Sequence, residues 1–91
     1  MASAEIKMTL LNKVGLHARP AVQFVLTAAR FTAAISVACR ERQANAKSIL
    51  QVLKLGATSR SEITIRAEGT DAEAALAALQ ALVAGRFGEA E

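Results

Sequence analysis

The sequence predicts an α+β fold, an open-faced two-layer sandwich in which three helices cover one face of a four-stranded antiparallel sheet. Two observations establish the element order and the open face. Segments with apolar residues at every second position and segments with helical apolar spacing follow one another as strand, helix, strand, strand, helix, strand, helix. Each strand alternates apolar and polar residues, so one sheet face is expected to contact water. A third observation concerns the helices, whose apolar stripes suffice to cover the other face.

Four segments are expected as strands because their apolar residues alternate with polar ones. The first spans residues 5–10, the second 33–39 and the fourth 62–67, and a short third strand is expected at about residues 42–45. The turn between the second and third strands, residues 40–42, lacks the Gly or Asn that a tight hairpin usually carries. The geometry of this turn therefore stays open.

Two helices precede the last strand. Apolar residues at helical spacing run from Ala18 to about Ala29, with a proline in the first turn. Ser48 is expected to cap a short apolar helix over residues 49–54. Gly56 follows this helix at the C′ position, where a residue without a Cβ atom is favoured.

The last helix follows the fourth strand. Thr70 and Glu73 have the spacing of a capping box, which predicts the start of this helix. Its apolar stripe consists of Ala72, Leu76, Leu79 and Val83. The helix is expected to end at Gly85.

The length and composition indicate one folded domain over residues 1–91. Ordinary domains contain about 100 to 150 residues, so 91 residues leave no room for two. A content of 53% hydrophobic and 21% charged residues is typical of a folded chain and argues against disorder. A chain this small cannot enclose a substrate in a deep cleft, so its function is expected at the surface and shared with partners.

Cysteine and histidine each occur once, as Cys39 and His17. This excludes an internal disulfide and leaves no cluster of soft ligands, so neither a metal nor another cofactor is expected. Cys39 closes a strand and is expected to be a small buried hydrophobe. A reducing, cytoplasmic location fits best, because the N-terminal residues do not form a signal peptide and no apolar run approaches about 20 residues. Membrane insertion is not expected.

The charge is unevenly distributed along the chain. Residues 1–67 carry 10 basic and 3 acidic groups, whereas residues 68–91 carry 1 basic and 5 acidic groups. One end of the molecule is therefore expected to attract acidic partners.

The segment with the strongest chemical signal begins at Gly15 and leads into the first helix, with the sequence GLHARPA. His17 stands at the N-cap position, near backbone N–H groups that have no partner inside the helix and that favour an anion. Pro20 is the third helical residue, where its missing N–H group costs no intrahelical bond. The amides of Ala18 and Arg19 therefore stay available to a phosphate.

Arg19 and His17 together fit phosphoryl transfer. Arginine presents a fixed fork of donors that matches phosphate oxygens. Histidine offers a neutral, nucleophilic nitrogen at cellular pH. The small residues Ala18 and Ala21 leave the ring open to a partner. A lone histidine near a helix start is more often a cap or an ordinary surface residue, but the combination at this helix start favours a phosphoryl carrier over an enzyme.

The GLHARPA segment resembles the active-site motif of the HPr family, the histidine-containing phosphocarriers of the bacterial phosphoenolpyruvate-dependent sugar phosphotransferase system. The similarity extends from about Glu5 to Phe87 and includes the later segment NAKSILQVLKLGA. The resemblance implies that Enzyme I, using phosphoenolpyruvate, phosphorylates His17 on Nδ1, and that His17 donates to a sugar-specific IIA protein. It further implies that Arg19 contacts the phosphate, and that the fold is an open-faced antiparallel sheet covered by three helices.

Ser48 has two interpretations that are physically compatible. A serine at the start of a helix is an N-cap, and its removal costs about 1 kcal/mol. In the HPr family, the serine that matches Ser48 is also a regulatory phosphorylation site in some bacteria. The resemblance therefore adds an HPr kinase to the candidate partners. A phosphate on Ser48 would weaken docking on an acidic partner.

A docking surface is expected on the short helix over residues 49–54. Its three large apolar residues are too many to bury on one narrow stripe, so some exposure beside His17 is expected, although burial of all three in the core is the alternative. These residues are Ile49, Leu50 and Leu53. The expected basic rim of this surface consists of Arg30, Lys47 and Lys54.

Two other functions have been weighed. A small nucleic-acid-binding module would share the positive charge and the order of elements. Such modules stack bases on aromatic residues of the open sheet face, and the outward strand positions here carry none. These positions are Lys7, Thr9, Ser36, Thr64 and Arg66. The second alternative is a regulatory paralogue within the family, in a nitrogen- or metabolism-linked relay. A monomer is expected, because a dimer that buried His17 could not donate.

Overall fold

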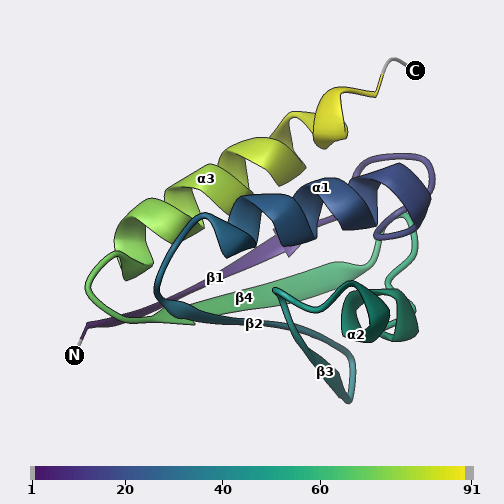
Figure 1. Cartoon of the computed structure of the whole chain (residues 1–91). Helices are drawn as coiled ribbons and strands as arrows, with labels where there is room; N and C mark the ends of the chain where they lie inside the picture. The colour runs from purple at the N-terminus through teal and green to yellow at the C-terminus, as the bar shows by residue number, and fades with distance from the viewer. Residues whose placement is uncertain (1, 90–91) are drawn as a thin grey trace.

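The four strands form one antiparallel sheet in the order β1-β4-β2-β3 (Figure 1). The computed structural model describes residues 2–89. Its elements are β1 (Ser3–Thr9), α1 (Ala18–Ala29), β2 (Ala34–Cys39), β3 (Arg42–Asn45), α2 (Ile49–Lys54), β4 (Glu62–Glu68), α3 (Ala72–Ala84) and the short 3₁₀ helix η1 (Arg86–Gly88). The predicted order of elements is confirmed.

The register of the sheet places apolar residues of neighbouring strands side by side. In β4, Ile65 lies opposite Ile6 of β1 on one side and opposite Val37 of β2 on the other. β1 begins two residues earlier than predicted and ends at Thr9. Leu10, which was expected in the strand, lies just beyond it and is fully buried.

The helices cover one face of the sheet and leave the other open. α1 and α3 lie side by side over this face, and α2 packs beside α1 and against β3 (Figure 1). The α+β fold class and the open-faced arrangement of four strands and three helices are therefore confirmed.

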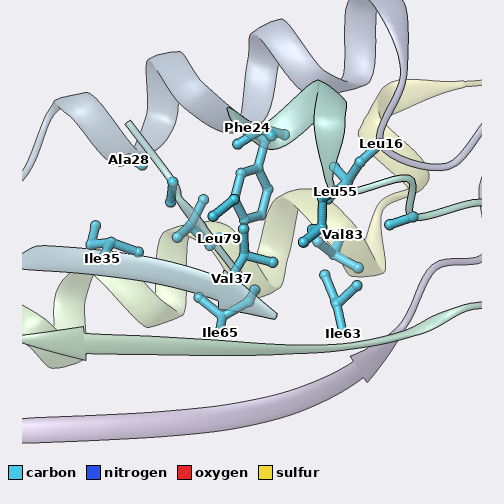
Figure 2. Packing of buried hydrophobic residues seen from close by; sticks show 14 of the residues in the cluster. Leu16, Phe24, Ala28, Ile35, Val37, Leu55, Ile63, Ile65, Leu79 and Val83 are labelled. Atoms are coloured by element: carbon cyan, nitrogen blue, oxygen red, sulfur yellow. The ribbon is translucent and has the colours of Figure 1, made fainter. Parts of the chain in front are cut away.

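The core lies between the helices and the sheet. Phe24 projects from α1 toward the sheet and is fully buried, as are Ile63 and Ile65 of β4 and Leu79 of α3 (Figure 2). Burial of each such side chain contributes about 1.5–3 kcal/mol. Cys39 is also buried, as expected. The alternating strand pattern in the sequence was thus a reliable guide to the core.

The loops gather at two ends of the sheet. We call the first the His17 end, which contains residues 10–17, 40–41, 55–61 and 85–88. We call the second the Asp71 end, which contains residues 30–33, 46–48 and 69–71. Backbone hydrogen bonds join segments at each end, for example Leu16 to Ala57 at the first and Gly69 to Ala2 at the second.

The predicted capping box at the start of α3 is wrong. Asp71, not Thr70, is the N-cap residue, and its side chain makes no hydrogen bond to the helix. The Asp71 carboxylate instead accepts hydrogen bonds from the backbone N–H groups of Thr32 and Ala33, both at 2.8 Å. The Asp71 carboxylate therefore binds the α1–β2 loop instead of the first amides of α3, and it joins this loop to the start of α3.

The turn between β2 and β3 is a two-residue hairpin turn, because Cys39 pairs with Arg42. Arg40 supplies the positive φ that such a turn requires, at 57°. A residue with a Cβ atom is strained there by roughly 1–2 kcal/mol. Because an arginine stands where such turns usually have Gly or Asn, the turn could not be predicted from its residues.

Candidate functional site

His17 stands at the junction of the β1–α1 loop and α1. Its backbone is extended, with φ −133° and ψ 154°, and its exposed side chain makes no capping hydrogen bond. The ring is therefore not used to stabilise the helix. The first backbone N–H groups of α1 have no partner within the helix, and they carry the positive end of its dipole.

The first turn of α1 departs from a regular helix at Ala18. The φ angle of Ala18 is 50°, in the left-handed region, so helical dihedral angles begin only after it. Pro20, the third residue of the helix, is buried and has no N–H group to satisfy. The polar groups left at this terminus are the amides of Ala18 and Arg19.

Arg19 lies two residues after His17 and is exposed. Within residues 2–89, its guanidinium takes part in no ion pair, since the ion pairs found there all involve Arg66. A free guanidinium next to unpaired helix amides is suited to hold a group with negative oxygens.

The loop before His17 is fixed by close backbone contacts. The N–H group of Leu16 donates to the carbonyl oxygen of Ala57 at 3.0 Å, and the Leu16 side chain is buried beneath the loop (Figure 2). Gly15 has φ 66°, and a Cβ atom at this position would lie 2.5 Å from the Ala57 oxygen. Only glycine fits this approach, so His17 is presented from a rigid support.

Asn12 is a further support of this loop that the sequence analysis missed. It is fully buried, and its Nδ2 donates to the carbonyl oxygen of Gly15 at 2.8 Å. Asparagine three residues before glycine is a common turn signal, which hinted at its role. The burial of Asn12 could not be inferred, because it lies in a loop, where no apolar periodicity marks which side chains are buried.

Exposed apolar residues lie on α1 and α2, which pack against each other. On α2, Leu50 is 60% exposed and Ile49 is 39% exposed, while Leu53 packs partly into the core. On α1, Leu26 is 63% exposed and Val22 is 45% exposed. We call Val22, Leu26, Ile49 and Leu50 the apolar patch. Val22 and Leu26 were missed, although they widen the apolar stripe of α1 beyond what one buried face needs.

The three predicted rim residues lie at different ends of the molecule. Arg30 follows the last residue of α1, and its guanidinium carbon lies 5.8 Å from the centre of the Phe31 ring. Lys47 donates from Nζ to the carbonyl oxygen of Phe31 at 2.6 Å. Both therefore lie at the Asp71 end, about 18 Å along α1 from His17. Only Lys54, the last residue of α2, lies toward the His17 end.

Ser48 caps α2, as predicted. Its Oγ accepts a hydrogen bond from the backbone N–H group of Gln51 at 3.3 Å. The serine is half-buried and follows Lys47 at the Asp71 end.

Residues 2–89 contain no group of three or more His, Cys, Asp or Glu side chains that could hold a metal ion. No helix in the same range has the length and apolar character needed to cross a membrane.

Comparison with known protein families identifies the family of this chain. A family model described as "PTS HPr component phosphorylation site" matches residues 4–85. The chain belongs to the HPr family of phosphocarrier proteins.

Individual members of the HPr family are similar over nearly the whole chain. The phosphocarrier protein HPr of Cupriavidus necator is 41% identical over 83 residues, which cover 91% of this chain and 93% of that protein. The phosphocarrier protein NPr of Shewanella violacea is 41% identical over 90 residues, which cover 99% of each. The crystal structure of HPr-C-His from Thermoanaerobacter tengcongensis superposes with a TM-score of 0.94 at 41% identity, covering 97% of this chain and 99% of that one.

The general role of the chain follows from its membership of the HPr family. It is a phosphocarrier of the phosphotransferase system, and its family consists of carriers rather than catalysts. The similarity to both HPr and NPr proteins is of the same order, so it does not select between these two branches.

Proposed function

We propose that His17 accepts a phosphoryl group from phosphorylated Enzyme I and donates it to a IIA protein of the sugar phosphotransferase system. The observation that carries this proposal is the exposed, uncapped His17 ring at the start of α1, with Arg19 free beside it. No other side chain of the described residues combines a nucleophilic nitrogen with this surrounding.

The transfer requires little from the protein beyond position and charge. The neutral Nδ1 atom of His17 attacks phosphorus, and the bond between phosphorus and the donor atom breaks as the N–P bond forms. The amides of Ala18 and Arg19 and the Arg19 guanidinium stabilise the charge on the phosphoryl oxygens. The same groups hold the product, and the reverse sequence of bond changes passes the phosphoryl group to the acceptor.

Exposure suits a carrier that serves two partners in succession. We assign the apolar patch on α1 and α2 to docking, because exposed apolar side chains beside a reactive residue mark a protein contact surface. Lys54 is the predicted basic docking residue on the His17 side, and Arg30 and Lys47 are those at the far end of the patch. A monomer in the cytoplasm fits this role.

Ser48 is proposed as a regulatory phosphorylation site for an HPr kinase. Its hydroxyl oxygen lies at the first amides of α2, where a phosphate is compatible with the helix terminus. The phosphate would place negative charge next to the docking helix α2.

A nitrogen- or metabolism-linked relay is the second candidate destination of the phosphoryl group. The Shewanella violacea NPr supports this second candidate, because it is as similar to this chain, at 41% identity, as the Cupriavidus necator HPr is. Parallel assays with a IIA protein from each branch separate the two, since the cognate acceptor takes the label at the higher kcat/KM.

The deciding experiment incubates the protein with Enzyme I and labelled phosphoenolpyruvate and maps the phosphate. Acid-labile label on His17 is expected, the His17→Ala variant should remain unlabelled while folded, and the Ser48→Ala variant should label normally. A folded wild-type protein that stays unlabelled, or that carries only acid-stable label on Ser48, contradicts the proposal.

A further inference from the structure

Three exposed arginines adopt the left-handed backbone conformation that favours glycine, namely Arg40, Arg60 and Arg86. Arg86 lies in η1, whereas Arg40 and Arg60 stand in turns. Arg40 has φ 57° as the first central residue of the β2–β3 turn. Arg60 has φ 73° at the third position of a turn in which the Ser61 N–H group donates to the Thr58 oxygen at 3.1 Å. Both positions call for a residue without a Cβ atom. A strained residue with a Cβ atom at such a position points to a use for its side chain.

Arg60 is tied to the loop that presents His17. Its backbone N–H group donates to the carbonyl oxygen of Leu10 at 2.7 Å, where the β1–α1 loop begins. The side chain of Arg60 is exposed. Its charge therefore lies on a short, anchored turn at the His17 end.

The turn that carries Arg40 is tied to the same end through α2. Nη1 of Arg42 donates to the carbonyl oxygen of Lys54, the last residue of α2, at 3.0 Å. Three residues further along the chain, the carbonyl oxygen of Ala57 accepts a hydrogen bond from the N–H group of Leu16. In Figure 1 the segment after α2 and the β1–α1 loop meet at the right of the view. The β2–β3 turn and the His17 loop are thus joined by one continuous segment.

The charges of Arg40 and Arg60 are free to act at a distance. Both side chains are exposed, and the ion pairs found within residues 2–89 involve neither of them. The His17 end holds further exposed basic residues, namely Lys13, Arg19, Arg42, Lys54 and Arg86. The acidic residues at this end are fewer, namely Glu41, Glu62 and Glu89, whose carboxylate accepts a hydrogen bond from the Lys13 N–H group. The end therefore has an excess of positive charge.

We infer that Arg40 and Arg60, which lie outside the apolar patch, attract an acidic surface on the protein that exchanges the phosphoryl group with His17. This inference rests on the proposed function of His17. Positive charge around a reactive site raises the rate of encounter with an acidic partner and leaves dissociation fast. A protein partner fits better than a nucleic acid, because the open sheet face offers no aromatic side chain for base stacking.

Substitution by glycine tests the inference without damage to the fold. Arg40→Gly and Arg60→Gly remove one charge each and also relieve the backbone, so the melting temperature should stay equal or rise. Arg40→Lys and Arg60→Lys keep the charge in the same backbone. Lys7→Gln, on an exposed position of β1 in the open sheet face, is the control for net charge alone.

The measurement is kcat/KM for labelling of His17 by phosphorylated Enzyme I at two salt concentrations. At about 0.02 M salt, each glycine variant should show a roughly three- to tenfold lower kcat/KM through KM alone, and at about 0.5 M salt the difference should fall below about twofold. The lysine variants and Lys7→Gln should match the wild type at both concentrations.

Several outcomes would overturn the inference while leaving the proposed function intact. They are wild-type kcat/KM for both glycine variants at low salt, a loss that does not depend on salt, and an equal loss for Lys7→Gln. Binding of single-stranded RNA at physiological salt that both glycine variants abolish would assign the arginines to a nucleic acid instead. Absence of label on the wild-type protein would overturn the proposed function and this inference together.

Discussion

At the scale of single residues, the proposed site assigns the nucleophile and the phosphate contact to two different side chains. The His17 side chain makes no capping hydrogen bond to the helix, and Arg19 has no ion-pair partner within the described residues. Both can therefore respond to a phosphoryl group without first breaking an internal contact. A preorganised site of this kind loses little free energy to rearrangement on transfer.

Arg19→Ala should lower kcat/KM for labelling of His17 about 10- to 100-fold without abolishing it, because the helix amides remain. Arg19→Lys should give an intermediate value, since lysine keeps the charge but lacks the planar fork. Steady-state labelling by Enzyme I measures both, and far-UV circular dichroism checks the fold. Equal rates for the alanine variant and the wild type would exclude Arg19 from phosphate contact.

Asn12→Ala should lower the free energy of unfolding by about 1–3 kcal/mol, because the carbonyl of the buried Gly15 loses its donor. Asn45→Ala is the matched control, since exposed Asn45 also bonds a nearby backbone group, the N–H of Lys47. It should cost less than about 1 kcal/mol. Urea unfolding measures both losses. Equal losses would show that burial of the Asn12 bond adds nothing.

The residues of the site differ in how well the sequence predicts them. The exposed position of His17 and Arg19 at a helix start was predicted because both lie in one motif, while their roles in phosphoryl transfer stay a prediction. Asn12 was missed because it lies in a loop, where no periodic pattern marks which side chains are buried. Ala18 was placed in the helix correctly, but its left-handed φ follows from packing that no local pattern records.

At the scale of elements, the ends of helices were predicted well where the capping residue has one partner. Ser48 caps α2 in the expected way, and Gly56 follows it with φ 72°. The capping box of α3 failed because the carboxylate of Asp71 binds amides of the α1–β2 loop, about forty residues away in sequence. The spacing of residues along the chain cannot show whether a carboxylate binds the amides of its own helix or those of a distant loop.

Asp71 makes the junction of α3 with the α1–β2 loop sensitive to acid. The backbone N–H group of Thr32 is the main cause that holds the pKa of Asp71 below its ordinary value of 3.8. A carboxyl group with a lowered pKa in the folded state adds stability above its unfolded pKa and loses it as the pH falls through the folded pKa. The wild type should therefore lose melting temperature between about pH 5 and about pH 2 more steeply than Asp71→Asn. Thermal melts across this range measure the difference, and parallel curves would contradict it.

At the scale of the whole molecule, the fold rearranges the charge that the sequence divides in two. The sequence places the excess of positive charge before residue 68. The structure collects part of it at the His17 end, while Arg30 and Lys47 lie at the other end beside Asp71 and Glu73. The prediction that one end attracts acidic partners thus needed the fold to say which residues form that end.

The last prediction concerns the apolar patch, which is formed by residues of two helices that are separate in the sequence. The double variant Leu26→Ser with Leu50→Ser should raise KM for Enzyme I and for the IIA protein about tenfold or more, since the burial of two leucine side chains on docking is lost. Its melting temperature should stay close to the wild-type value, because both side chains are more than half exposed.

Phosphoramidate, a small phosphoryl donor, provides the control for this variant. It reaches His17 without docking on α1 and α2, so its labelling rate should be the same for the double variant and the wild type. Partner-dependent loss with unchanged labelling by the small donor assigns the patch to docking. A loss with both donors would instead place Leu26 and Leu50 among the residues that shape the site itself.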